Sequence, residues 1–405
     1  MQEYLRLLAD GQVRVDALIQ REYPLAEAAS AYADLRDATV KPLMILLAYP
    51  EKPADARPQT RLVNPTVAAT PGEGRVRLAL VGAGGFAKGM HLPNIQGLSD
   101  DYRLHAVVSR GGHNAQAVAR QYEARYATTD VDEVLHDADV DAVLIATRHH
   151  LHAGLTLRSL QAGKHVLVEK PLAMTAEELD RIERFFEARE RAPVLLTGFN
   201  RRFSPHLRPI RELVDRRLNP VIANYRMNAG HIPSAHWVHG PEGGGRNIGE
   251  ACHIYDLFTA LANSEVTSVQ AEALVPKTTH YRRDDNFVAT LAFADGSVTT
   301  LTYTALGHKD HPKERLELFC DGVVAELDDY RRTQLSGAAG KGVQSAIPDK
   351  GQREELQAFA AAIRGETEWP IPLWQQLQAM RIAFEVEALF GGGEAGKPVQ
   401  QMDDD

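Results

Sequence analysis

Short apolar runs alternate with helical stretches between residues 76 and 198. The runs have the length of buried strands, and the intervening segments around 87–97 and 113–125 are typical of helices. This alternation predicts an α/β fold with a doubly wound parallel sheet over residues 75–200. The expected strands are 76–81, 103–109, 140–146, 164–169 and 193–198.

After about residue 205 the pattern changes to strands joined by tight turns. Turns such as Ala294-Asp295-Gly296-Ser297 lie between apolar segments, which favours antiparallel hairpins. We therefore expect a second α/β domain over 201–390 with a large open, mostly antiparallel sheet. Its expected strands are 220–229, 266–275, 286–294, 297–304, 314–320 and 322–327; its helices lie near 247–262, 352–364 and 373–390. The tail 391–405 is glycine-rich and then acidic, and it is expected to fray.

The first 74 residues do not follow either pattern. Residues 1–50 form an N-terminal extension, in which 26–35 has helical character and the apolar run 42–47 predicts a buried strand. Residues 51–74 are rich in Pro, Ala and Thr and show no period, so we expect a linker there.

Composition narrows the function classes. The chain has 405 residues and a net charge of −9, and it has no basic stripe, which argues against a nucleic-acid partner. Two cysteines cannot build a disulfide framework, and no CxxC pattern for a metal is present. The N-terminus is unlike a signal peptide, and no apolar run has the length of a membrane span. We expect a soluble cytoplasmic protein without a membrane partner.

A glycine-rich loop, Gly82-Ala83-Gly84-Gly85-Phe86-Ala87, follows directly on the first strand and opens a helix. Gly82 permits a tight turn, and Gly84 lets the backbone approach a pyrophosphate. The small Ala87 lets helix and strand pack closely, so the phosphates lie on the positive end of the helix. The loop predicts a Rossmann domain that binds a dinucleotide.

The end of the second strand bears on the choice of cofactor. NAD-selective sites usually hold an acidic residue here for the ribose 2′-hydroxyl, whereas an arginine suits a 2′-phosphate. Ser109 and Arg110 stand in place of the acid, which favours NADP over NAD. In the alternative interpretation Arg110 only stacks on adenine, which fits either cofactor.

Two later strands also end in polar side chains, at the carboxyl edge where open α/β sheets bind ligands. The segments are DAVLIATRHHLHA at 141–153 and AGKHVLVEKPLAMT at 162–175. A lysine at such an edge, beside a positively charged nicotinamide, suits proton exchange with a sugar hydroxyl. Lys170 is this lysine; taken alone, it would more readily be interpreted as a surface charge that caps a turn before Pro171.

These segments, with GAGGFA at 82–87, GFNRRFSP at 198–205 and GGGRNIGEACHIYDL at 243–257, resemble the glucose-fructose oxidoreductase / inositol dehydrogenase (Gfo/Idh/MocA) family over residues 75–390. The resemblance implies an α/β domain after the Rossmann domain, whose sheet often builds homodimers or homotetramers. It implies that Lys170 helps to bind the nicotinamide and exchanges a proton with the reacting hydroxyl. The implied cofactor-binding set is Gly82, Gly84, Gly85, Phe86, Ala87, Ser109, Arg110, Thr147, His149, His152, Glu169 and Lys170.

The second-domain site departs from the family in one position. Many members have an aspartate four residues before a histidine, on one face of a helix; here His253 matches the histidine, but Gly249 stands at the aspartate position. Glu250 shares the face of His253 and is a candidate to orient it or to replace the acid in part. His253 and Glu250 are therefore catalytic candidates, and a satisfied core histidine is the alternative for His253.

Further candidates for substrate binding lie nearby. Asn200 and Arg201 follow the fifth strand, where an arginine suits a carboxylate or a diphosphate, or alternatively ties the two domains together. Arg226 and Trp237 belong to a stretch expected to face the substrate, although Trp237 would more commonly be a core or interface residue. The closely spaced His149, His150 and His152 lack clustered Cys or Glu ligands, so no metal is expected.

The N-terminal segment 11–50 resembles the extreme C-terminus of a medium-chain zinc-type alcohol dehydrogenase, without its second glycine loop or zinc ligands. The chain is therefore expected to be a truncated or degraded fusion of two dehydrogenases. An ordinary helical extension is the alternative.

Together these features predict an NAD(P)-dependent oxidoreductase that moves a hydride between nicotinamide and a ring carbon of a sugar, cyclitol or nucleotide sugar. Two other interpretations remain open: an NAD-dependent glycosidase that oxidises its substrate transiently, and a nucleotide-sensing or sugar-sensing binding protein without turnover.

Overall fold

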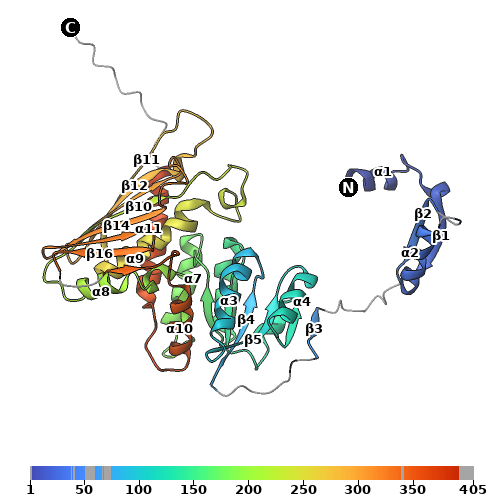
Figure 1. The fold of residues 1–405 in the computed structure, drawn as a ribbon, viewed down its shortest axis with the longest axis horizontal. Helices are drawn as coiled ribbons and strands as arrows, with labels where there is room; N and C mark the ends of the chain where they lie inside the picture. Colours follow the sequence, from blue (N-terminus) through green and yellow to red (C-terminus); the bar gives the residue numbers. More distant parts are fainter. Residues whose placement is uncertain are drawn as a thin grey trace, which may run out of the picture. The chain divides into compact units, whose positions relative to one another are not determined.

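The computed structural model describes residues 2–37, 39, 42–50, 60–65, 67, 74–338 and 342–391. It divides into a small unit, residues 1–59, and a large unit, residues 60–405, and each is described by itself (Figure 1). The tail expected to fray lies, apart from Gly391, outside the described residues. None of the described helices is long and apolar enough to cross a membrane.

The small unit contains a two-stranded parallel sheet. After helix α1 (Gln2–Ala9), strand β1 (Ile19–Pro24) leads through α2 (Ala28–Arg36) to β2 (Met44–Ala48), which pairs with β1. The predicted helix and the predicted strand are both present, but the strand is not buried, since Leu43 and Leu46 are exposed. Two strands and one short helix offer too little surface to cover an apolar run on both faces. Strand β1, which carries three charged or polar side chains in a row, was not predicted.

The Rossmann sheet of the large unit has seven strands in the order β3-β6-β5-β4-β7-β8-β9. Strands β4 to β9 pair in parallel, as predicted, and the edge strand β3 is antiparallel. The bounds are β3 (Arg61–Val63), β4 (Val76–Val81), β5 (Tyr102–Val108), β6 (Tyr126–Thr128), β7 (Ala142–Ile145), β8 (His165–Val168) and β9 (Leu195–Thr197). Strand β3 lies in the segment 51–74 that was expected to be only a linker; residues 51–59 of that segment lie outside the described residues.

Helices cover the Rossmann sheet between its strands. The first begins after the glycine loop as a π-helical turn, η3 (Ala87–His91), and continues as α3 (Leu92–Gly97). The others are α4 (Gly112–Gln121), α5 (Asp132–Leu135), α6 (His152–Gln161) and α7 (Ala176–Glu187). Strands that are buried on both faces along most or all of their length, such as β4 and β7, explain why this sheet was predicted from continuous apolar runs rather than alternating ones.

The second sheet has eight strands in the order β11-β12-β13-β10-β14-β15-β16-β17, and only β10 and β13 pair in parallel. This confirms the large, mostly antiparallel sheet. The bounds are β10 (Ile222–Asn228), β11 (Val266–Ala273), β12 (Phe287–Phe293), β13 (Val298–Thr304), β14 (Glu314–Cys320), β15 (Val323–Asp328), β16 (Arg332–Ser336) and β17 (Val343–Gln344). Alternating burial along β12 and β14 shows that one face is packed and the other is partly open.

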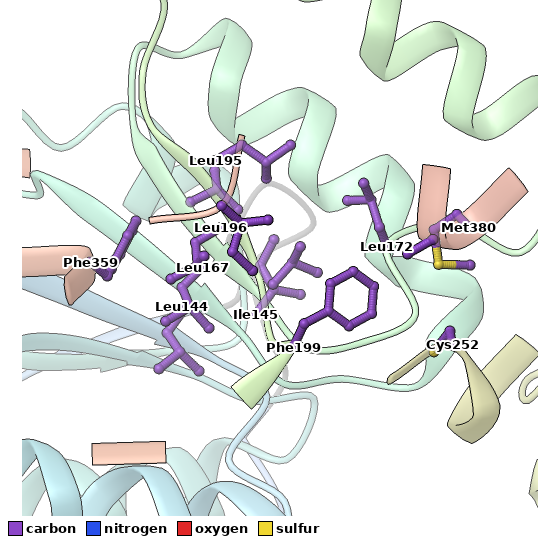
Figure 2. Close-up of a cluster of buried hydrophobic side chains, with 14 of the residues drawn as sticks. Leu144, Ile145, Leu167, Leu172, Leu195, Leu196, Phe199, Cys252, Phe359 and Met380 are labelled. Atoms are coloured by element: carbon purple, nitrogen blue, oxygen red, sulfur yellow. The ribbon is translucent and has the colours of Figure 1, made fainter. Parts of the chain in front are cut away.

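Two helices join the packed face of this sheet to the Rossmann domain, α9 (Cys252–Ala262) and α11 (Leu373–Gly391). A third helix, α10 (Gln352–Ile363), packs on α3 and on the turn at 200–203. Figure 2 shows Phe199 and Leu172 between the Rossmann strands and two side chains of the second domain, Cys252 on α9 and Met380 on α11. The hydrophobic core therefore runs without a break from one sheet to the other.

Candidate active site

The glycine loop has the backbone that a dinucleotide requires. Gly82 has φ +102°, and a Cβ there would lie 2.5 Å from the carbonyl oxygen of Ala146 on the neighbouring strand end. A Cβ on Gly84 or Gly85 would meet no atom within 4 Å, so this backbone is open to a ligand. Ala87 is buried against the sheet, whereas Phe86 is exposed and packs edge-on against His91. The loop therefore fits a pyrophosphate on the backbone N–H groups of Gly84 and Gly85.

A hydrogen-bonded group lies at the end of β5, where the ribose of a bound dinucleotide is expected. The side-chain amide of Asn114 donates to Ser109 Oγ (3.2 Å) and to the carbonyl of Ala83 (2.9 Å). Lys88 Nζ donates to Asn114 Oδ1 at 2.5 Å, which brings a cation to this end. Arg110 is exposed. The sequence analysis did not identify Lys88 or Asn114, because neither residue belongs to the strand end. Lys88 lies in the first turn after the glycine loop, and Asn114 lies in the first turn of α4.

Lys170 lies where the two domains meet. It follows β8, and its Nζ donates to the carbonyl oxygen of Gly249 at 2.8 Å. Beside it, Glu169 is buried and accepts a hydrogen bond from His91 Nε2 at 2.7 Å. Burial opposes the ionised form of Glu169, but His91 and Lys170 outweigh it and hold its pKa below the usual value. His152 donates from Nδ1 to the carbonyl of Pro171 and also contacts that of Thr147, so it joins the two strand ends.

His253 lies in the first turn of α9 and is 5% exposed. Burial lowers the pKa of its imidazole well below the usual value, and Arg201, Lys170, Lys350 and Lys313 lower it further. The imidazole is therefore neutral at physiological pH. Its Nδ1 is buried and has no hydrogen-bond partner among the described residues.

Glu250 is engaged in ion pairs. Its carboxylate accepts from Lys313 Nζ (2.6 Å), Arg246 Nη2 (2.9 Å) and the hydroxyl of Tyr303 (2.5 Å). Burial opposes ionisation, but these three partners hold the pKa of Glu250 far below its usual range. A carboxylate occupied in this way is a poor proton acceptor. The geometry therefore favours a role in which Glu250 positions Lys313 and Arg246, rather than the predicted role in which it orients His253.

His149 occupies the space beside Gly249. A Cβ on Gly249 would lie 2.8 Å from His149 Cε1. The ring is held by its Nδ1–H, which donates to the carbonyl of Gly243 at 2.8 Å, and by an edge contact with Trp237 at 4.9 Å between ring centroids. Because a carbonyl can only accept, Nδ1 carries the proton and Nε2 carries the lone pair. Burial and the charge of Lys170 lower the pKa of His149 to about 3, so the ring is neutral. An imidazole thus lies where a side chain at position 249 would begin.

The predicted substrate-binding residues separate into two groups. Arg201 forms a buried two-pronged pair with Glu314 (2.7 and 3.0 Å), and the Asn200 amide donates to the carbonyl of Lys350, so both connect the domains. For Arg201 the structure thus favours the domain-tying alternative over a substrate contact. Arg226, on β10 of the second sheet, donates to the carbonyl of Pro312 in the segment before β14. Trp237 stays at the candidate site, between His149 and the Arg148 guanidinium, which lies 4.0 Å from its ring centroid.

Comparisons with known proteins agree with this architecture. The model of the Gfo/Idh/MocA oxidoreductase family with an NAD-binding Rossmann fold matches residues 76–198, and that of the Gfo/Idh/MocA C-terminal domain matches residues 217–325. An inositol 2-dehydrogenase of Paenarthrobacter aurescens is 32% identical over 308 residues, which cover 72% of this chain and 88% of the relative. The chain therefore belongs to the Gfo/Idh/MocA family of oxidoreductases.

Solved structures show the same fold. A UDP-N-acetylglucosamine 3-dehydrogenase of Acidithiobacillus ferrooxidans superposes with a TM-score of 0.66 at 22% identity, over 78% of this chain and 97% of that one. A myo-inositol dehydrogenase of Lactobacillus casei in complex with NAD(H) and myo-inositol superposes with a TM-score of 0.65 at 20% identity, over 80% and 98% of the two chains. At this level of identity the likeness is one of fold.

Replacing Gly82 by Ala tests the glycine loop. The added Cβ meets the Ala146 carbonyl in a backbone conformation that is strained for alanine, so we expect a loss of roughly 3 kcal/mol of stability. We also expect weaker nucleotide binding, because the loop must shift. Thermal melting and calorimetric titration with NAD and NADP measure both effects. Gly89→Ala is the matched control, since a Cβ there meets no atom within 4 Å; equal behaviour of the two variants would refute the assignment.

Gly249→Asp tests whether His149 fills the space at position 249. The single variant forces the His149 ring to move, and we expect a loss of about 2 kcal/mol in the free energy of unfolding. Combining it with His149→Ala removes the clash, so the two losses are not additive and a double-mutant cycle by urea unfolding shows a favourable coupling. His150→Ala, which changes an exposed neighbour, gives no such coupling. Additive losses in the His149 cycle would show that the ring does not occupy this space.

Proposed function

We propose that this chain transfers a hydride between a nicotinamide dinucleotide and a ring carbon of a sugar, cyclitol or nucleotide sugar. The observation that supports this most directly is the contact between Lys170 Nζ and the Gly249 carbonyl. It places the lysine that ends a strand of the nucleotide-binding sheet four residues from His253 along the second-domain segment. A ring carbon held between the two domains would meet both side chains.

The chain's own residues supply the proton chemistry. When bound, the nicotinamide supplies the hydride acceptor or donor. In oxidation the O–H proton of the substrate passes to the neutral Nζ amine of Lys170; in reduction the ammonium returns it. His253, kept uncharged by burial and by its cationic neighbours, hydrogen-bonds the same oxygen and orients it. His149 offers an acceptor, Nε2, to a hydroxyl or N–H group of the substrate.

We further propose NADP as the preferred cofactor. Ser109 and Arg110 stand where NAD-selective sites hold an acid, and Lys88 adds a cation through Asn114 at the same strand end. A 2′-phosphate would find two positive side chains here and no opposing carboxylate on this strand end.

For the N-terminal segment we propose a relationship to the end of a medium-chain alcohol dehydrogenase. Strand β1, helix α2 and strand β2 form a β–α–β arrangement with parallel strands, which a plain helical extension would lack.

Lys170→Met tests the proton role. The thioether side chain fills a similar volume but cannot take a proton, so we expect turnover to fall by about 10²- to 10⁴-fold while nucleotide affinity is largely kept. Lys170→Arg keeps a donor for the Gly249 carbonyl but does not release its proton, so it should be inactive too. Steady-state nicotinamide absorbance and calorimetric titration are the measurements. Near-normal turnover of either variant would rule out Lys170 as the proton-exchanging group.

Arg110→Ala and Lys88→Met test the cofactor proposal. Each removes a charge expected to meet the 2′-phosphate, so each should weaken NADP binding about tenfold and leave NAD binding almost unchanged. Calorimetric titration of the wild type and both variants with the two nucleotides gives the ratio of affinities. The NAD affinity serves as an internal control for folding. A wild type that prefers NAD, or variants that lose both affinities equally, would contradict the proposal.

A further inference from the structure

Two carboxylates near His253 are each shared by two cations. Glu250 binds Lys313 Nζ at 2.6 Å and Arg246 Nη2 at 2.9 Å. Glu314 binds Arg201 Nε at 2.7 Å and Lys350 Nζ at 2.6 Å. Each carboxylate with its two cations therefore has a net charge of one positive unit.

The two groups adjoin each other and the proton-exchanging lysine. Lys313 and Glu314 are consecutive residues at the start of β14, and their side chains reach one group each. Glu250 follows Gly249, whose carbonyl accepts from Lys170. We call Lys170, Arg201, Arg246, Lys313 and Lys350 the cationic cluster. Burial lowers the pKa of the His253 imidazole, and four members of the cluster lower it further.

The charges of this region do not balance. Lys170 is left out of this count because it is neutral when it accepts the substrate proton. The other four members of the cationic cluster have four positive charges, and Glu250 and Glu314 have two negative ones, which leaves an excess of two. The buried carboxyl of Asp285, whose pKa burial raises to about 6, interacts with Arg246 and reduces the excess to one when it is ionised. Two further buried acids do not reduce it. Asp256 is engaged with the additional cation Arg202, and burial raises the pKa of Glu355 well above its usual value, so Glu355 is uncharged.

Exposure distinguishes the members of the cluster. The side chains of Arg201 and Arg246 are 6% and 2% exposed, whereas those of Lys313 and Lys350 are 39% and 23% exposed. The two lysines can therefore reach a ligand, while the arginines hold the carboxylates in place. A local excess of positive charge in a chain of net charge −9 concentrates anions at this site.

We propose that Lys313 and Lys350 form a subsite for an anionic group of the substrate, which is therefore a sugar bearing a carboxylate or a phosphate. The inference deepens the proposed function, on which it rests: the anion binds beside the hydroxyl that Lys170 and His253 serve. Carboxylate and phosphate share the charged oxygens that lysine ammonium groups bind. A uronic acid and the diphosphate of a nucleotide sugar are the two sources.

A comparison of neutral and anionic sugars distinguishes a carboxylate from a diphosphate as the group that binds. The full chain, saturated with NADP or NAD, is titrated calorimetrically with D-glucose, D-glucuronate, UDP-glucose and UDP alone. We expect at least one anionic probe to bind about tenfold more tightly than D-glucose, with an affinity that falls as salt is added. Tight D-glucuronate indicates the carboxylate source, and tight UDP-glucose with competition by UDP indicates the diphosphate source.

Variants locate the subsite. Lys313→Met and Lys350→Met should each lower the ratio of anionic to neutral affinity about tenfold, and Lys313→Arg should restore it. Lys309→Met is the control, because Lys309 is exposed on the segment between β13 and β14 and makes the same change of charge. Equal binding of anionic and neutral probes, or equal effects of Lys313→Met and Lys309→Met, would overturn the inference.

The two levels of the proposal can fail separately. If neutral sugars alone reduce the nicotinamide, the anion subsite is refuted and the hydride-transfer function stands. If the anionic probes bind through Lys313 and Lys350 but no sugar in the panel changes the redox state of the nicotinamide, the subsite stands and the oxidoreductase function of this chain is refuted.

Discussion

A single buried carboxylate, that of Glu314, holds the two domains of the large unit in register. It is fully buried at the start of β14 and accepts from Arg201, Lys350 and the hydroxyl of Tyr225. Arg201 lies at the domain boundary, in the turn that follows the last Rossmann strand, so the interaction attaches this boundary to the second sheet. Burial of a charge is costly, but three partners satisfy this one, and removing any buried partner of such a pair costs about 3–5 kcal/mol. The geometry of the candidate site depends on this attachment.

From that attachment the positions of the reactive groups follow. Arg202, next to Arg201, binds Asp256 of α9 in the same two-pronged way (2.9 and 2.5 Å). Since α9 also carries His253, this buried ion pair fixes the part of the helix to which that imidazole belongs. The apolar core in Figure 2 fills the space between the same elements. Charge pairs thus fix the direction in which α9 points, and packing fixes its distance from the Rossmann sheet.

The sequence predicted the elements that have a strong local signal. The predicted bounds of the buried parallel strands and of the hairpin strands lie within two residues of the observed ones, because apolar runs and Asp-Gly turns are local features. The strands β3, β6 and β17 have three residues or fewer, and β16 is largely polar, so their existence depends on a neighbouring strand that a local pattern does not reveal. The same distinction between local and long-range features applies to the candidate site. Motifs identified Lys170 and His253, but the ion-pair partners of Arg201 and Glu250 lie 113 and 63 residues away along the chain.

The glycine at position 249 then has a physical explanation that involves more than one residue. His149 lies on a strand end of the Rossmann domain, and its ring takes the volume that a side chain on the second-domain segment would need. The neutral His149 ring, which offers a hydrogen-bond acceptor, thus stands in the place of an aspartate at position 249. An additional carboxylate here would have reduced the positive excess around His253, whereas an imidazole with a pKa of about 3 leaves it intact. Gly249, His149 and the cationic cluster are therefore parts of one electrostatic arrangement, in which the charge that balances the lysines is left for a ligand to supply.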